Sequence, residues 1–292
     1  MSKCCAALIG CALLGLFACS ETPEPPAASA THSRVVTLAP NLTELVFAAG
    51  AGDKLVGASA YSDYPDIARR LPIIGDAFAV DQEQLAILQP DLLLGWESGT
   101  PDHVVEELRS LGYNVEAIRT RTLADVADAL RRIGELTDSV ARAEIVAKAY
   151  NASLQNIRIR YENVEDLRVF YQVDRRPLYT VNDEHYVSEL IRLCGGSNVF
   201  ADLDELAPAV DVEAVVERNP EVILASSDAG SDAFAEWERW PHIAANQYRN
   251  RFLIPADEIG RATTRLLVAA EAVCEALQEA RKRRALAMAN PA

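Results

Sequence analysis

The sequence has few of the residues on which catalysis and metal binding usually depend. Among its 292 residues there are only four histidines, His32, His103, His185 and His242. It contains no G-x-S-x-G nucleophile motif, no P-loop and no dinucleotide-binding glycine fingerprint. A metal receptor needs several histidines or carboxylates that converge on one point, and such scattered histidines do not indicate one. The chain is therefore predicted to be neither an enzyme nor a metal-binding protein, and to hold no cofactor.

Positive charge is also scarce. The chain has 28 Lys and Arg against 43 Asp and Glu, which gives a formal net charge of -15. Proteins that bind nucleic acid neutralise phosphates with clustered Lys and Arg, so the composition argues against a nucleic-acid partner. An acidic surface instead suits solubility, or a partner with a basic face.

A long apolar run stands at the N-terminus. Lys3 is followed by CCAALIGCALLGLFAC, which has the length of a signal-peptide core and is too short to span a bilayer comfortably. Its end, LFAC, resembles the lipobox of bacterial lipoproteins, in which the cysteine, here Cys19, is lipidated. An ordinary secretory signal with a coincidental cysteine is the alternative. Residues 1–18 are predicted to be a signal peptide, and residues 19–33, rich in Pro, Ala, Ser and Thr, a lipid-anchored tether.

The cysteine count bears on the folded part. Of the six cysteines, three leave with the predicted signal peptide and Cys19 would carry the lipid. Cys194 and Cys274 then remain. Two thiols in an oxidising compartment suggest a disulfide, and two separate buried thiols are the alternative.

From Arg34 onward, strand-like and helix-like segments alternate, which predicts an α/β fold with largely parallel sheets. The first helix is expected to be capped by Asn41 or Thr43. Residues 139–163 differ, because they contain no Gly or Pro and keep a helical apolar period. The chain is thus predicted to form two Rossmann-like lobes, residues 34–137 and 164–287, joined by one long helix over residues 138–163.

A repeated pattern links the two lobes. Residues 81–96 read DQEQLAILQPDLLLGW and residues 211–226 read DVEAVVERNPEVILAS, an offset of 130 residues. Each copy predicts a short helix that ends before Pro and then a buried strand, with Asp81 and Gln84 placed as a capping box. Because both copies fall at equivalent places in the two lobes, they indicate an internal repeat.

Aromatic residues follow several predicted strands. Tyr61 lies in the loop after the second strand, Trp96 ends a strand, and Tyr179 falls in the corresponding region of the second lobe. Ligands of open α/β sheets bind outside the carboxyl ends of the strands, where aromatic rings could stack on a large flat molecule. The alternative is that these rings cap their lobe cores. Asp257 and Arg261 follow the late strand RFLIPAD and could bond a ligand, or pair with each other across one turn.

Several segments together resemble a known family. RVVTLAPNLTELVFAAG, YSDYP, ILQPDLLLGW, LCGGSNVF and AAEAVCEAL are similar to segments of the substrate-binding proteins of bacterial ABC importers for cobalamin and iron complexes, above all of its cobalamin-binding members. The resemblance covers residues 34 to about 280. It implies the class III fold, two α/β lobes joined by a rigid helix, and a disulfide between Cys194 and Cys274.

The resemblance also implies roles for individual residues. Tyr61 and Trp96 match aromatics that face the corrin ring, Tyr179 falls at an aromatic position of the second lobe, and Asp257 falls where a carboxylate bonds the ligand. Two departures stand out, because small residues near Asp76 and at Ala207 occupy positions where the cobalamin-binding members have tryptophans. Phe78 is a candidate to replace one of them.

Glu83 and Glu213, the third residues of the two repeat copies, match glutamates that dock into arginine pockets of the membrane permease. The alternative is that acids simply favour the first turn of a helix, where the helix dipole stabilises each by ~0.3 to 1 kcal/mol. That alternative explains an acid in each copy but not the same position in both.

The predicted function is that of a monomeric, lipid-anchored protein at the periplasmic or cell-surface side of a membrane. It would capture cobalamin or another corrinoid between its lobes and deliver it to an ABC permease and ATPase complex. An iron-siderophore or haem receptor of the same class is the alternative, and a cell-surface enzyme on the same scaffold is a third reading from a different class.

Overall fold

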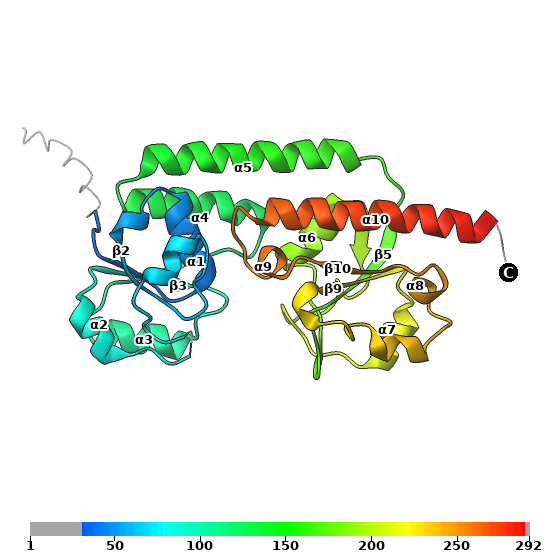
Figure 1. Cartoon of the computed structure of the whole chain (residues 1–292), viewed down its shortest axis with the longest axis horizontal. Coiled ribbons are helices and arrows are strands. Elements are labelled where there is room, and N and C mark those ends of the chain that lie inside the picture. Colours follow the sequence, from blue (N-terminus) through cyan, green and yellow to red (C-terminus); the bar gives the residue numbers. More distant parts are fainter. Residues whose placement is uncertain (1–30, 77, 290–292) are drawn as a thin grey trace, which may run out of the picture. The chain divides into compact units, whose positions relative to one another are not determined.

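The computed structural model describes residues 31–76 and 78–289. The predicted signal peptide, the lipidation site Cys19 and most of the tether lie outside these residues. The described chain forms two α/β lobes, each built on a four-stranded parallel sheet, and a long helix runs between them (Figure 1). The N-terminal sheet has the strand order β2-β1-β3-β4: β2 (Leu55–Ala58), β1 (Val35–Thr37), β3 (Leu92–Trp96) and β4 (Val115–Ile118).

Apolar residues that alternate along β1 and β3 bury both faces of this sheet. Val35, Leu92 and Leu94 belong to one core, which α1 and α4 cover, whereas Val36 and Leu93 belong to a second core, which α2 and α3 cover. This is the two-faced burial that continuous apolar strands predict. The covering helices are α1 (Pro40–Ala48), α2 (Gln82–Leu88), α3 (Asp102–Ser110) and α4 (Leu123–Leu136).

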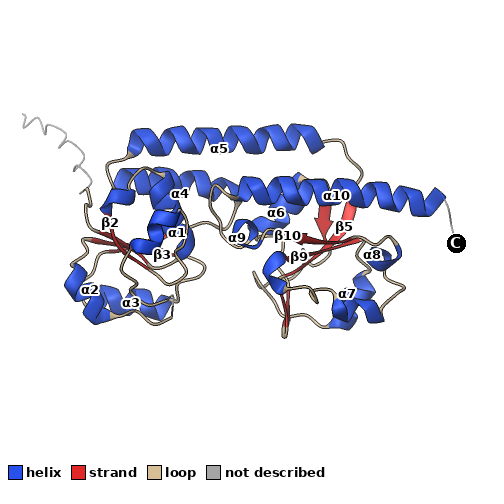
Figure 2. Ribbon diagram, viewed as in Figure 1, coloured by secondary structure: helices blue, strands red, loops and turns tan. Residues whose placement is uncertain are grey.

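The C-terminal lobe repeats this plan with the strand order β10-β9-β5-β8. Figure 2 shows α10 and α7 on opposite sides of its strands. Leu167 and Leu224 face α6 and α10, whereas Phe170 and Ile223 face α7 and the fully buried Trp237. The elements are β5 (Leu167–Gln172), α6 (Tyr186–Leu193), β8 (Gly196–Asn198), α7 (Val212–Arg218), β9 (Val222–Ser226), α8 (Ala244–Gln247), β10 (Arg251–Ile254), α9 (Ala256–Ile259) and α10 (Leu266–Ala289). Short 3₁₀ segments lie at Gly52–Lys54, Asp66–Arg70, Ser227–Ala229 and Ala235–Arg239.

The connecting helix is α5, which runs over Val140–Tyr161 and confirms the prediction of a single long helix. Its 22 residues span about 33 Å at 1.5 Å per residue. One stripe is buried, against α4 of the first lobe and against α6 and α10 of the second. The stripe belongs to one apolar core that reaches into both lobes, so the lobes are not independently packed; its members are Ala143, Ala147, Tyr150, Leu154, Ile157 and Tyr161.

The structure differs from what the sequence alone indicates at three places. Helix α6 ends at Leu193, just before the paired glycines, and Gly196–Asn198 then form β8, a polar edge strand with none of the residues that favour strands. The strand-like segment LYTV pairs only at Leu178–Tyr179, as β7 in a hairpin with β6 (Asp174–Arg175). The first helix begins at Pro40, because proline suits the first helical position better than Asn41 or Thr43 suits capping here.

The structure bears out the internal repeat. α2 and α7 each have seven residues, an aspartate as N-cap and a C-cap in the left-handed conformation, with φ of 45° at both Gln89 and Asn219. Asp81 accepts a hydrogen bond from the backbone N–H of Gln84 at 2.9 Å, but the reciprocal bond of a capping box does not form. Asp211 makes no such bond with its side chain.

Cys194 and Cys274 form a disulfide, as predicted, which ties the end of α6 to α10. Within residues 31–76 and 78–289, no helix combines the length and apolar character needed to cross a bilayer.

His185 is the N-cap of α6 and gives the C-terminal lobe a pH-dependent element. Its Nδ1 accepts a hydrogen bond from the backbone N–H of Val187 at 3.2 Å, which requires a neutral ring. Burial lowers the pKa of His185 from 6.5 to about 4.

We expect the free energy of unfolding to fall as the pH drops from about 6.5 to about 4, because the unfolded chain then binds a proton that folded His185 excludes. His185→Asn keeps a side-chain acceptor that does not titrate, so its unfolding should depend less on pH in this window. The expected difference is on the order of a few kcal/mol, because it comes from the lowered pKa of His185 and each pKa unit corresponds to about 1.4 kcal/mol. Urea unfolding at several pH values measures it. His242→Asn, at an exposed loop position, is the control, and an equal effect there would contradict the assignment.

Candidate ligand-binding site

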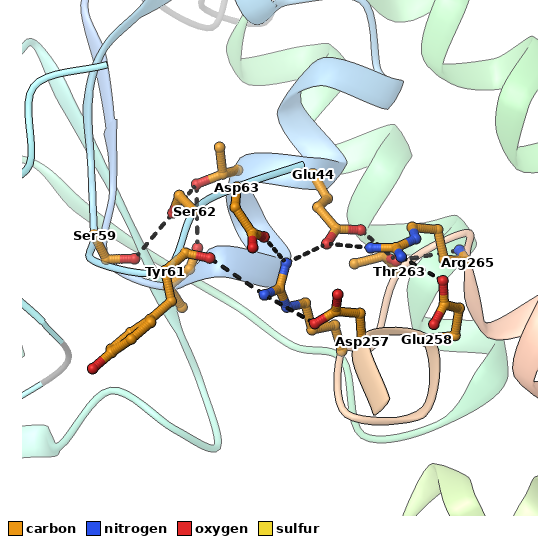
Figure 3. A network of polar contacts seen from close by, with 12 residues as sticks. Glu44, Ser59, Tyr61, Ser62, Asp63, Asp257, Glu258, Thr263 and Arg265 are labelled. Carbon is orange, nitrogen blue, oxygen red and sulfur yellow. Dashed lines mark hydrogen bonds and ion pairs between the residues drawn. The ribbon is translucent and has the colours of Figure 1, made fainter. Parts of the chain in front are cut away.

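A chain of hydroxyl groups connects the loop after β2 to β1 and α1. The Oγ1 atoms of Thr37 and Thr43 lie 2.7 Å apart, Thr43 Oγ1 lies 2.9 Å from Ser62 Oγ, and Ser62 Oγ lies 3.3 Å from Ser59 Oγ (Figure 3). All four side chains are buried. The loop is therefore a fixed part of the N-terminal lobe.

Tyr61 stands at the tip of this loop. Its φ of 65° lies in the left-handed region, which a bulky residue rarely adopts, and its side chain is 79 % exposed. Figure 3 shows the ring directed away from the neighbouring ion pairs. Strained backbone that presents an exposed aromatic ring is a common feature of binding sites.

Phe78 lies on the adjacent loop. The backbone N–H of Ala60 donates to the carbonyl of Gly75 at 2.7 Å, and the N–H of Phe78 donates to Asp76 Oδ1 at 2.8 Å. Gly75 has φ of 104°, and a Cβ there would lie 2.0 Å from a backbone oxygen, so the turn requires glycine. The backbone bonds from Phe78 and its neighbour hold the pKa of Asp76 below its usual value. With its side chain 74 % exposed, Phe78 gives this lobe a second open aromatic surface.

Trp96 is held differently. Its indole is partly buried and lies over Gly99, where an added Cβ would come within 2.0 Å of the ring. The backbone N–H of Trp96 donates to Thr100 Oγ1 at 2.9 Å. Among the described residues its Nε1 has no hydrogen-bond partner although it is buried. One ring face is thus taken up by its own turn, and its predicted contact with a ligand stays a prediction.

Tyr179 is held by backbone pairing in the second lobe. It lies partly buried on the β6–β7 hairpin, where it pairs with Asp174 and bridges to Ala209. Within the described part of the chain it forms no hydrogen bond with the other predicted ligand residues. Its role in binding also stays a prediction.

Arg261 brings residues of the two lobes together. Its Nη1 donates to Asp63 Oδ1 at 2.7 Å and to Glu44 Oε1 at 2.9 Å, and its Nη2 donates to the carbonyl of Tyr61 at 3.3 Å. Asp257 Oδ1 lies 3.4 Å from the same Nη2. The structure therefore brings two predicted ligand residues, Tyr61 and Asp257, to the guanidinium of a third, Arg261.

Glu44 is the centre of this network. Its side chain is 3 % exposed and accepts bonds from three residues of the other lobe: Arg261, Thr263 Oγ1 at 3.0 Å and Arg265 Nη1 at 3.2 Å (Figure 3). Arg265 also pairs with Glu258 and lies over the ring of Tyr64, 4.2 Å from its centroid. We call Glu44, Asp63, Arg261, Thr263 and Arg265 the lobe clamp.

Contacts within the clamp shift the pKa values of its charged residues. Burial alone would lower the pKa of Arg261, but the hydrogen bonds and charges of Asp63 and Glu44 outweigh it and raise that pKa. Burial would likewise raise the pKa of Asp63, yet Arg261, aided by Arg69, leaves it below the ordinary value. Both partners thus stay charged at neutral pH.

Sequence reasoning missed most of the clamp. It proposed that Arg261 bonds a ligand or pairs with Asp257; the second pair exists, but the shorter bonds of Arg261 go to Glu44 and Asp63. A signal was present, because Glu44 is a carboxylate within the otherwise apolar helix segment TELVFAAG. A buried acid requires a cationic partner.

Glu83 and Glu213 occupy equivalent places on α2 and α7. Both are exposed residues of the first helical turn, and within residues 31–76 and 78–289 neither side chain forms a hydrogen bond or ion pair. Both helices lie on the side of their lobes away from α5 (Figure 1). The two carboxylates are thus open to a partner.

A cavity of about 580 Å³ lies elsewhere, between α5, the start of α4 and α6. It includes none of the predicted ligand residues, and its charged side chains have both signs, Arg158 and Arg192 beside Glu162 and Glu189. Among the described residues, no group of three or more His, Cys, Asp or Glu is placed to hold a metal ion.

Comparison with known proteins identifies the family. The model of the periplasmic binding protein family matches residues 35–258, which is more than half of the chain. The chain belongs to the periplasmic binding protein family. This confirms the resemblance read from the sequence, and because the family consists of substrate-binding proteins, it also confirms that the chain is not an enzyme.

Individual relatives of this periplasmic binding protein agree. The vitamin B12-binding protein of Vibrio cholerae is 34 % identical over 276 residues, which cover 94 % of this chain and 98 % of the relative. The crystal structure of the Vibrio cholerae periplasmic vitamin B12 binding protein BtuF matches with a TM-score of 0.79 over 86 % of this chain and 98 % of that one. The haem-binding protein BhuT, at 21 % identity and a TM-score of 0.76 over 86 % of this chain and 99 % of that one, shares the fold. The predicted class III fold is thereby confirmed.

We expect Gly99→Ala to displace the indole of Trp96, because the new Cβ would overlap the ring. The displacement should shift the tryptophan emission and lower the thermal midpoint by several degrees, as overpacking costs about 1 to 3 kcal/mol. Gly95→Ala is the matched control, since its Cβ would meet nothing closer than 3.8 Å. Equal spectra for the two variants would show that Gly99 does not fix the ring.

Proposed function

We propose that this periplasmic binding protein captures cobalamin or a related corrinoid between its lobes and delivers it to an ABC permease and ATPase complex. One observation carries the proposal: the identity of 34 % to a vitamin B12-binding protein extends over nearly the full length of both chains. An identity of this extent includes both lobes and the connecting helix rather than one shared motif.

The geometry around the lobe clamp supports a large, flat ligand with polar edges. Tyr61 and Phe78 offer two exposed aromatic surfaces on neighbouring loops of the first lobe, suited to stack on a ring system. Asp257, 55 % exposed on the second lobe, offers a carboxylate that could accept bonds from side-chain amides of a corrinoid. The contributions of Trp96 and Tyr179 belong to the same proposal.

A haem or iron-siderophore ligand is the second candidate. Phe78 favours it, because an exposed phenylalanine beside Asp76, in place of a tryptophan, changes the aromatic surface that a corrin ring would meet. Haem also presents a flat ring, but its carboxylates would be repelled by Asp257 and by the excess of acidic residues. Charge therefore favours the corrinoid.

We further propose that the mature chain is a monomer anchored by lipid at Cys19, and that residues 20–33 hold it away from the membrane. The support is the lipobox-like LFAC sequence and the periplasmic location of the relatives that the comparisons name. Glu83 and Glu213 would then meet basic pockets of the permease, one for each lobe, and would set orientation and encounter rate.

The ligand assignment predicts that cyanocobalamin and cobinamide quench tryptophan fluorescence with saturable binding, and bind more tightly than haem or a ferric siderophore. Titration of the purified protein with each compound measures the dissociation constants. Tyr61→Ala should weaken corrinoid binding about tenfold, in line with the loss of one aromatic stacking contact. Tyr113→Ala, which changes a tyrosine of the same lobe just before β4, is the control. Preference for haem would replace the first proposal by the second.

The docking assignment predicts that Glu83→Arg and Glu213→Arg together abolish corrinoid uptake by cells and leave the dissociation constant of the purified protein unchanged. Glu106→Arg with Glu275→Arg changes the net charge equally at two other exposed sites and should leave uptake intact. Uptake assays with labelled cobalamin measure both pairs. A loss of ligand affinity in the first pair would instead assign these glutamates to the ligand site.

A further inference from the structure

Glu44 lies too deep to touch a ligand, yet it determines where the ligand-facing residues stand. Its side chain is 3 % exposed, and its three polar partners, Arg261, Thr263 and Arg265, all come from the other lobe. The bonds of Glu44 therefore form only when the two lobes are at the right separation.

Two exposed candidates for ligand contact, Tyr61 and Asp257, share one neighbour in this network. Arg261 Nη2 lies 3.3 Å from the carbonyl oxygen of Tyr61, in the first lobe, and 3.4 Å from Asp257 Oδ1, in the second. Glu44 and Asp63 hold the other nitrogen, Nη1, at 2.9 and 2.7 Å. The position of Arg261 thus fixes Tyr61 relative to Asp257.

The lobes are joined at two further places. α5 packs against elements of both lobes, and the backbone N–H of Leu123, at the start of α4, donates to Glu189 Oε2 of α6 at 2.5 Å. A continuous helix alone would still permit bending about its ends. The clamp adds a contact next to Tyr61 and Asp257, where bending would change their separation.

We propose that Glu44 is a positioning residue for the ligand: through Arg261 it sets the separation of Tyr61 and Asp257 before the ligand arrives. The identity of the ligand in this inference rests on the proposed function, whereas the geometry of the clamp does not. Since the clamp satisfies Arg261 with Glu44 and Asp63, the longer contact leaves the exposed carboxylate of Asp257 available to a ligand. Preorganisation of this kind strengthens binding because less motion is lost on association.

The test compares three variants of the full chain that each remove one carboxylate from the same two arginines. Glu44→Gln breaks the contact between lobes, Glu258→Gln removes a partner of Arg265 within one lobe, and Asp257→Asn changes the ligand-facing acid. Spin labels attached through non-natural amino acids at positions 106 and 217 report the lobe separation by pulsed electron resonance. Titration with cyanocobalamin reports affinity.

The wild-type protein should give a narrow distance distribution that cyanocobalamin leaves unchanged. Glu44→Gln should broaden the distribution without ligand and raise the dissociation constant roughly tenfold. Glu258→Gln should change both the width of the distribution and the dissociation constant by less than about twofold. Asp257→Asn should raise the dissociation constant while the distribution stays narrow.

The inference would be overturned if Glu44→Gln gave a narrow distance distribution. It would also be overturned if the distribution broadened while the affinity for cyanocobalamin stayed unchanged. If Glu44→Gln does not fold, Asp63→Asn replaces it, because Asp63 contacts the same guanidinium from a more exposed position. If the wild-type protein does not bind cyanocobalamin, the proposed function fails, while the distance distributions still decide whether Glu44 sets the lobe separation.

Discussion

The buried carboxylate of Glu44 is the interaction on which the arrangement of the two lobes depends. A charge at this depth is tolerated only with cationic partners, and those partners, Arg261 and Arg265, belong to the other lobe. Apolar packing through α5 joins the lobes but is non-directional. The clamp adds directional bonds, so the lobes have one favoured separation rather than a range.

The architecture could be predicted because each of its signals is local. Alternating apolar strands and helices predicted the parallel sheets, and the absence of Gly and Pro over residues 139–163 predicted α5. The repeat predicted two similar lobes. Strand β8 was missed because its origin is not local: Gly196–Asn198 carry no strand signal and become β8 only because β5 offers a free edge. Tertiary pairing there outweighs intrinsic preference.

The site was predictable only where one residue carried the signal. The resemblance directed attention to Tyr61, Phe78 and Asp257, whose exposure fits a surface that meets a ligand, whereas the packing of Trp96 over Gly99 was not visible in the sequence. Glu44 and Arg261 are separated by 217 positions, and no periodicity connects such distant residues. The sequence can indicate that a buried acid needs a cationic partner, but only the fold determines which residue is that partner.

The rigid frame has a consequence for how transport could be regulated. α2 and α7 have the same length and similar caps, and each is packed on its own sheet, so Glu83 and Glu213 keep their spacing as long as the clamp holds. Under the proposed docking, an empty molecule and a loaded one present nearly the same pair of acids. Empty protein would then compete with loaded protein for the transporter, and the rate of uptake would depend on the ratio of the two forms as well as on the supply of ligand.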